Sequence, residues 1–202
     1  MTKPDLTKWW VERADPQSVA AHMWAKWQDE HRVMGLTALR LLSPVTSVYE
    51  LGCGSGPNLR LLKEYWPVPL VLGGSEPSPG LAAWASEHLG IHIDQLALPG
   101  VPEDPWDVIL TCYALAYVEP EDVLATFAAL KARALVILEP NGAIQGAPAG
   151  LMQMTEDGHP VGVPEWHHDY PALLAESGWR MTWRWPMSRR VHGLNAVLIA
   201  ER

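Results

Sequence analysis

The chain has 202 residues, of which 48% are hydrophobic and 19% are charged, and its formal net charge is −8 at pH 7. This length suits one domain over residues 1–202 with a well-buried core, and the composition excludes a disordered chain. The acidic surplus argues against a nucleic-acid partner, because proteins that bind nucleic acids usually carry a basic face.

No stretch of the sequence approaches the ~20 apolar residues of a membrane span, and the first ten residues lack the apolar core of a secretory signal. We therefore expect a cytoplasmic protein with no membrane partner. In a reducing compartment Cys53 and Cys112 should remain free thiols. The neighbouring His167 and His168 lack companions at metal-ligand spacing, so no metal site is expected.

Residues 1–44 are predicted to form an irregular arm followed by one long helix. Asp15 and Pro16 are typical of an N-cap and a first helical residue, and apolar residues recur at helical spacing up to Ser43 and Pro44. Packing against a sheet is the simplest role for this helix.

Between residues 45 and 140 the pattern changes to strands that alternate with helices. This order favours a doubly wound, mostly parallel sheet with helices on both faces, an α/β fold. Strands are predicted at about 46–51, 69–75, 91–94, 106–111 and 134–138, and helices at about 57–65, 79–89 and 119–133.

The glycine turn after the first predicted strand is the most informative feature. Glu50 closes an apolar strand, Gly52, Gly54 and Gly56 follow at alternate positions, and Pro57 opens a helix. Glycines let the backbone approach a ligand, and the free N–H groups at the helix start lie behind that ligand. A dinucleotide fingerprint needs G-x-G-x-x-G, so the spacing does not match NAD. A glycine turn without a ligand is the alternative.

A second carboxylate follows the second predicted strand. Glu76 lies 22 residues after Gly54, close to the ~20-residue offset at which doubly wound folds hydrogen-bond ribose hydroxyls. A carboxylate can accept from both ribose hydroxyls at once.

An apolar strand, an acidic residue and G-x-G-x-G together resemble motif I of the class I (Rossmann-like) S-adenosylmethionine-dependent methyltransferases. Further segments follow in that family's order: Glu76, then Asp94 and Gln95 before Leu-Ala-Leu-Pro, then Asp107 at the start of the fourth strand. The resemblance implies a seven-stranded sheet. Residues 169–202 would supply its last helix and a C-terminal antiparallel hairpin, and residues 1–44 would form an N-terminal helical lid.

The resemblance also implies the cofactor, S-adenosyl-L-methionine, which becomes S-adenosyl-L-homocysteine after transfer. Glu50 and the glycine-turn backbone would hold its methionine end, Glu76 with the adjacent Pro77 its ribose, and Asp94 with Gln95 its adenine. The missing side chain at the middle glycine would leave the space that the cofactor needs.

Ligands of doubly wound folds lie outside the carboxyl ends of the strands, so Thr111 and Cys112 should line the cofactor or the substrate. Cys112 is similar to the nucleophile of cytosine-C5 methyltransferases, but those enzymes place Pro before it and this chain has Thr. The Asn/Asp-Pro-Pro-Tyr/Phe platform of adenine and glutamine methyltransferases is absent. A buried or cofactor-lining thiol is the favoured interpretation.

Residues 141–168 are rich in Gly, Pro and Ala and are predicted to form a loop that covers the substrate, because long loops in compact domains are often functional. His167 and His168 end this loop and are candidates for a catalytic base, since imidazole titrates near neutral pH. A helix-cap or surface role is the alternative, and an acceptor that is already a good nucleophile needs no base.

The leading hypothesis is methyl transfer to an oxygen or nitrogen of a small-molecule acceptor, by in-line displacement at the sulfonium methyl. The chain shows no accessory domain and no basic face that would hold a polymer. Two alternatives stay open: a protein or RNA methyltransferase that works with a partner subunit, and a regulatory or scaffolding subunit that binds S-adenosylmethionine without turnover.

Overall fold

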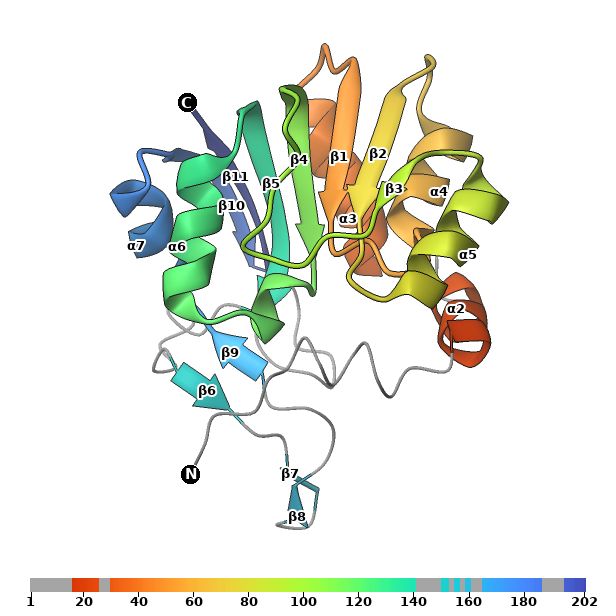
Figure 1. The fold of residues 1–202 in the computed structure, drawn as a ribbon. Coiled ribbons are helices and arrows are strands. Elements are labelled where there is room, and N and C mark those ends of the chain that lie inside the picture. The colour runs from red at the N-terminus through yellow and green to blue at the C-terminus, as the bar shows by residue number, and fades with distance from the viewer. Residues whose placement is uncertain are drawn as a thin grey trace.

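A computed structural model describes residues 16–25, 30–140, 150–152, 155–156, 159–160, 165–186 and 195–202. Its main element is a seven-stranded sheet in the order β10-β11-β5-β4-β1-β2-β3 (Figure 1). The parallel strands are β1 (Ser47–Leu51), β2 (Val71–Ser75), β3 (Ile93–Asp94), β4 (Trp106–Cys112) and β5 (Ala132–Pro140). The antiparallel pair β10 (Arg180–Pro186) and β11 (Asn195–Glu201) completes the sheet beside β5. The predicted sheet and its C-terminal hairpin are confirmed.

Helices cover both faces of this sheet, because successive side chains of a strand point to opposite faces. On one face α3 (Glu30–Leu41) and α4 (Pro57–Tyr65) pack over a cluster that includes Val48 of β1. On the other face α6 (Pro120–Ala129) and α7 (Tyr170–Glu176) pack through Phe127 and Leu174 into the cluster of Tyr49. A smaller cluster joins α4 to α5 (Pro79–Leu89).

One predicted helix boundary differs from the structure, and one predicted helix includes residues outside the described part. The region predicted as one helix contains α2 (Pro16–Ala25) and α3, and residues 26–29 between them lie outside the described part. Helix α6 ends at Ala129 instead of about Arg133. Residues beyond it favour a helix by propensity, but Ala132 already pairs with Trp106 as the first residue of β5, and sheet pairing overrides the propensity.

Short strands lie in the segment 141–168 that was predicted to be a loop. β6 (Gly150–Met152) pairs with β9 (Glu165–His167), and β7 (Thr155–Glu156) pairs with β8 (His159–Pro160). The loop prediction is wrong for these residues, because the Gly and Pro content marks turns and does not exclude antiparallel pairs between the turns. Figure 1 shows β6 and β9 beyond the carboxyl ends of the parallel strands.

In the part of the chain that the structure describes, no helix is long and apolar enough to cross a membrane. Among the same residues, no group of three His, Cys, Asp or Glu side chains could hold a metal ion. Cys53 and Cys112 are both free thiols, as predicted.

Candidate active site

The glycine turn lies where β1 ends, and it meets the turn that follows β4. Gly52, Gly54 and Gly56 have φ angles of 63°, 58° and 77°. Residues other than glycine rarely adopt this left-handed backbone conformation, which explains why glycine occupies alternate positions of the motif. A Cβ atom on Gly52 would lie 2.5 Å from the Cβ of Ala114, so the backbone of the glycine turn packs against the side chain of Ala114 in the second turn.

The other two glycines face helices. A Cβ on Gly54 would lie 2.6 Å from Cε of Met23 on α2, and one on Gly56 would lie 2.4 Å from Cδ1 of Leu89 on α5. The space over Gly54, which was predicted to hold the cofactor, therefore contains the terminal methyl group of the flexible Met23 side chain. Gly56 allows the turn to pack closely on α5.

Glu50 is a buried carboxylate directly before the glycine turn. Its side chain is 1% exposed, and Oε1 accepts a hydrogen bond from Nδ2 of Asn58 on α4. Among the described residues Oε2 has no partner. Burial raises the pKa of Glu50 to about 8, although the Asn58 hydrogen bond and the positive charge of Arg32 lower it. An unpaired buried carboxylate oxygen is costly, so this atom fits a cationic ligand group.

Arg32 of α3 extends this arrangement. Its guanidinium donates to Oδ1 of Asn58 at 3.0 Å, while Nδ2 of the same amide donates to Glu50. The amide therefore links a cation on α3 to the carboxylate on β1. Such a chain fixes the orientation of both oxygens of Glu50.

Glu76 follows β2 and lies beside the glycine turn. Its two oxygens accept hydrogen bonds from the backbone N–H groups of Gly54 at 3.0 Å and Ser78 at 2.9 Å. Burial raises the pKa of Glu76, and these two N–H groups oppose the increase. Each oxygen keeps a second lone pair that could accept from a ribose hydroxyl. Pro77, the next residue, is half-buried beside it.

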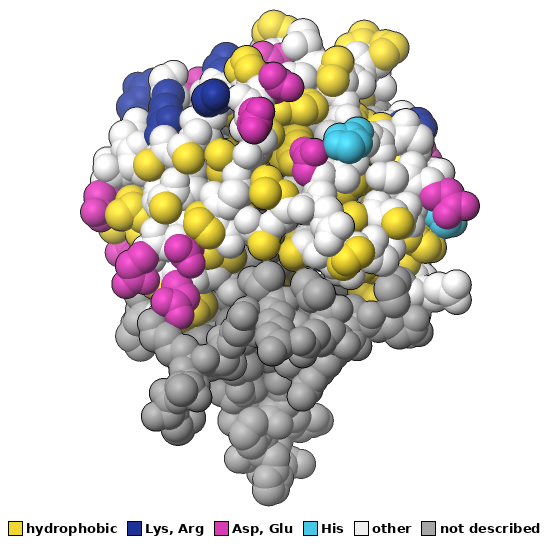
Figure 2. Space-filling model, in the orientation of Figure 1, with side chains coloured by type: hydrophobic (Ala, Val, Ile, Leu, Met, Phe, Trp, Pro, Cys, Tyr) yellow, Lys and Arg dark blue, Asp and Glu magenta, His cyan; other side chains and the backbone are white. Residues whose placement is uncertain are grey.

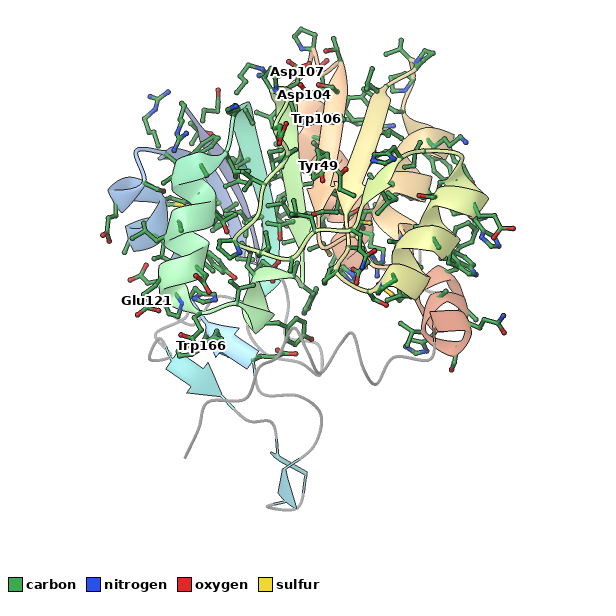
Figure 3. All side chains as sticks on the ribbon, in the orientation of Figure 1. Tyr49, Asp104, Trp106, Asp107, Glu121 and Trp166 are labelled. Atoms are coloured by element: carbon green, nitrogen blue, oxygen red, sulfur yellow. The ribbon has the colours of Figure 1, made fainter. Side chains whose placement is uncertain are left out.

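Asp94 ends β3 and is held by two side chains. Tyr49 of β1 donates its hydroxyl to Oδ2 at 2.7 Å, and Nε2 of His92 lies 2.9 Å from Oδ1. The ring of Tyr49 packs against Trp106 on the face of the sheet shown in Figure 3. The side chain of Asp94 is 41% exposed, so it remains open to an adenine amino group. Gln95 is exposed beside it.

Thr111 and Cys112 end β4. Thr111 is fully buried and donates its hydroxyl to Oε1 of Glu139 at 2.8 Å, so this hydroxyl already has a partner inside the fold. Cys112 is half-buried, and removal of its sulfur from solvent raises the pKa of the thiol to about 12. A thiol with this pKa is protonated at neutral pH, which is unfavourable for a nucleophile.

The N-terminal helices reach the same edge of the sheet. Trp24 of α2 donates its indole N–H to the carbonyl of Ser55 in the glycine turn at 2.8 Å, and its ring packs edge-on against Trp84 of α5. The ring of His31 on α3 lies 5.5 Å from that of Tyr113, which follows β4. The irregular arm before α2 lies outside the described residues.

His167 and His168 are both buried, and burial lowers the pKa of each, which keeps the rings neutral at pH 7. Nε2 of His168 lies 2.9 Å from the carbonyl oxygen of Leu115, so this nitrogen carries the proton and donates it. Nδ1 of each ring has no partner among the described residues. His168 directly follows β9 and therefore ties the end of this strand to the 3-10 helix η1 (Leu115–Tyr117).

Asp107 is far from this edge. Figure 3 shows it at the amino end of β4, opposite to the end where Trp166 lies on β9. It accepts from the backbone N–H of Thr46 at 2.7 Å and from the hydroxyl of the same residue, and these bonds lower its pKa. This acidic residue of the family pattern links the starts of β4 and β1.

The model of a methyltransferase domain family matches residues 20–193 of the chain. The chain belongs to this family. The match confirms the resemblance to class I S-adenosylmethionine-dependent methyltransferases, and the protein is an enzyme of that class. Comparison with curated protein sequences finds no match.

Solved structures of this fold are similar over nearly the whole methyltransferase. Magnesium protoporphyrin IX methyltransferase from Synechocystis PCC 6803 with bound SAM has a TM-score of 0.68 at 14% identity, and the match covers 100% of this chain and 99% of that chain. Streptomyces venezuelae DesVI has a TM-score of 0.67 at 12% identity, with coverage of 94% and 99%. The sugar N-methyltransferase KedS8 from Streptoalloteichus sp ATCC 53650 has a TM-score of 0.68 at 16% identity, with coverage of 92% and 92%.

The sequence analysis did not identify four residues that contribute to the candidate site: Asn58, Arg32, Tyr49 and Glu139. Asn58 is the second residue of a helix that opens on proline, and nothing in the local sequence pairs its amide with Glu50. Glu139 directly precedes Pro140 at the end of an apolar strand, in the position that Glu50 and Glu76 take after theirs. Arg32 and Tyr49 carry no local signal, because their partners are distant in the sequence.

Proposed function

We propose that the protein transfers the methyl group of S-adenosylmethionine to an oxygen or nitrogen atom of a small-molecule acceptor. The observation that carries the proposal is the unpaired Oε2 of Glu50 at the glycine turn, within a fold whose family uses this cofactor. S-adenosylmethionine is the cofactor. When bound, it supplies an electrophilic methyl group on a sulfonium sulfur, and the protein mainly supplies geometry and exclusion of water.

The residues present fit each part of this cofactor. Glu50 would pair with the methionine ammonium, Glu76 would accept from the ribose hydroxyls, and Asp94 would accept from the adenine amino group. The glycine turn offers backbone that approaches closely, once the flexible end of Met23 moves from Gly54. Asp94 is already oriented by the Tyr49 hydroxyl, so its side chain loses little conformational entropy when a ligand binds.

Two observations support a small-molecule acceptor. On the face shown in Figure 2, most of the described Lys and Arg side chains lie at the upper left, and Asp and Glu side chains occur on both the left and the right of the face. A polyanion needs a continuous basic surface, which this face does not offer among its described residues. Similar folds include a protoporphyrin methyltransferase and a sugar N-methyltransferase.

We assign the base, where the acceptor needs one, to His167. Its ring is neutral at pH 7 because burial lowers its pKa, and Nδ1 has no partner among the described residues. It lies on β9, on the carboxyl side of the parallel strands (Figure 1). His168 instead donates to Leu115, so it would position the segment.

The test is calorimetric titration with S-adenosylhomocysteine, with NADH as the control ligand. We expect one-to-one binding of S-adenosylhomocysteine alone; no binding, or binding of NADH instead, would refute the cofactor site. A panel of tetrapyrrole carboxylic acids and amino sugars would then be tested for methyl transfer. Transfer only to a protein or RNA would favour the partner-dependent alternative, and tight cofactor binding with no acceptor would favour the regulatory one.

A further inference from the structure

Glu139 is a buried carboxylate that no step of the proposed reaction uses. It lies near the carboxyl end of β5, is 0% exposed, and is surrounded by donors from the end of β4 and the segment directly after it. Oε1 accepts from the hydroxyl of Thr111 at 2.8 Å, from the N–H of Ala114 at 2.7 Å and from the N–H of Leu115 at 3.0 Å. Oε2 accepts from the N–H of Ala116 at 3.3 Å. A carboxyl group, which has acceptor lone pairs on both oxygens, satisfies four converging donors.

The segment that these bonds hold contains a strained residue. Tyr113 has a φ angle of +56°, which is an outlier for a bulky side chain. Such conformations persist where the surroundings over-determine the backbone, and they concentrate at functional sites. Here the hydrogen bonds of Thr111 on one side and Ala114 on the other bracket Tyr113, so Glu139 fixes the backbone at both ends of the strained residue.

The strained turn contacts the glycine turn of the candidate cofactor site. Ala114 abuts Gly52, where a Cβ would lie only 2.5 Å away, so the turn and the glycine turn are in direct contact. The ring of Tyr113 lies 5.5 Å from that of His31 at an interplanar angle of 72°, which joins the turn to α3. The residue with the left-handed backbone therefore carries an aromatic ring that contacts α3.

We propose that Glu139 is a positioning residue, which holds residues 113–116 in place so that the ring of Tyr113 forms a wall of the cofactor pocket beside the glycine turn. The inference rests on the proposed function, because the pocket is the one assigned to S-adenosylmethionine. The left-handed conformation of Tyr113 is retained because the ring contributes to ligand binding, at the expense of the stability of the free protein.

The first experiment compares Tyr113→Gly with Tyr113→Ala. Both variants lack the ring, but only glycine adopts the left-handed conformation without strain. We expect both to weaken S-adenosylhomocysteine binding roughly tenfold, while the glycine variant melts a few degrees, about 2–4 °C, above the alanine variant. If the glycine variant binds as tightly as the wild type, the ring is not part of the pocket and the proposal fails.

The second experiment asks whether Glu139 acts through Tyr113. Glu139→Gln keeps one oxygen for the three donors at Oε1 but presents an amide N–H₂ to the N–H of Ala116. We expect roughly threefold weaker binding of S-adenosylhomocysteine in the wild-type background and no further loss in the Tyr113→Gly background. Equal losses in both backgrounds, or wild-type affinity of Glu139→Gln, would overturn the positioning role. Failure of the wild type to bind S-adenosylhomocysteine would instead refute the proposed function itself.

Discussion

Replacement of Glu50 by glutamine should make the free enzyme more stable at high pH and weaken its hold on the cofactor. The carboxyl group is 1% exposed, and burial raises its pKa from 4.5 to about 8. Between these two values the folded state binds more protons than the unfolded state, so the free energy of unfolding falls as the pH rises. The full shift corresponds to roughly 5 kcal/mol, which is an upper limit for the loss between pH 4.5 and pH 8.

The measurement is urea unfolding of wild type and Glu50→Gln at pH 5.5 and pH 8.5. Burial also raises the pKa of Glu139, to about 7, but this residue is present in both proteins and cancels in the comparison. We expect the stability of Glu50→Gln relative to the wild type to increase by a few kcal/mol, about 2–4, from the lower to the higher pH. A difference that does not change with pH would show that Glu50 is ionised normally in the free protein.

Cofactor binding should favour the ionised form of Glu50 and so release a proton. At pH 7 a group with a pKa of about 8 is roughly nine-tenths protonated. An ammonium group opposite Oε2 favours the ionised form, so S-adenosylhomocysteine binding should release up to about one proton per site. Titrations in buffers with different ionisation enthalpies measure this release. The same release from Glu50→Gln would assign the proton to another group and refute the reasoning.

Three further variants test the remaining contacts. Glu76→Ala should weaken S-adenosylhomocysteine binding by the ~1.5–3 kcal/mol typical of lost charged hydrogen bonds, and unchanged affinity in calorimetry would remove the ribose assignment. Tyr49→Phe removes the hydroxyl that orients Asp94 and should raise the dissociation constant roughly fivefold; the reasoning fails if adenosine competes equally well against both proteins. Trp24→Phe removes the N–H that donates to Ser55. The free energy of opening measured by amide hydrogen exchange in α2 should therefore fall by about 1 kcal/mol, and unaltered exchange would show that this hydrogen bond does not hold α2.

The order of the strands and the place of the glycine turn could be predicted from the sequence because their signals are local. An apolar run ended by Glu50 and alternate glycines specifies a strand, a turn and a helix within about fifteen residues. The helix at Pro79–Leu89 matched its prediction at both ends, since proline opens it and glycine in the left-handed conformation closes it.

The partners of the buried polar groups could not be predicted, because they depend on which strands are neighbours in the sheet. Tyr49 and Asp94 are separated by 45 residues, and they meet only because β2 alone lies between β1 and β3. Glu139 meets Ala114 because β5 lies beside β4. A tyrosine in an apolar strand and a glutamate before a proline each suit many structures, and only the assembled sheet selects one partner for each.

Four acidic residues end or follow four of the parallel strands, and this arrangement explains how an acidic edge can serve a positively charged cofactor. Glu50, Asp94 and Glu139 lie in β1, β3 and β5, Glu76 follows β2, and the carboxyl ends of these strands meet at one edge of the sheet. Two of them have backbone N–H groups as partners, one has Tyr49 and His92, and only Glu50 keeps an oxygen without a partner among the described residues. A carboxylate whose charge is already balanced by fixed donors holds structure or accepts from neutral hydroxyl and amino groups. In the proposed site, the one that is not balanced would stay protonated until a cation binds, so the same burial that raises its pKa would make its ionisation depend on the ammonium group of the cofactor.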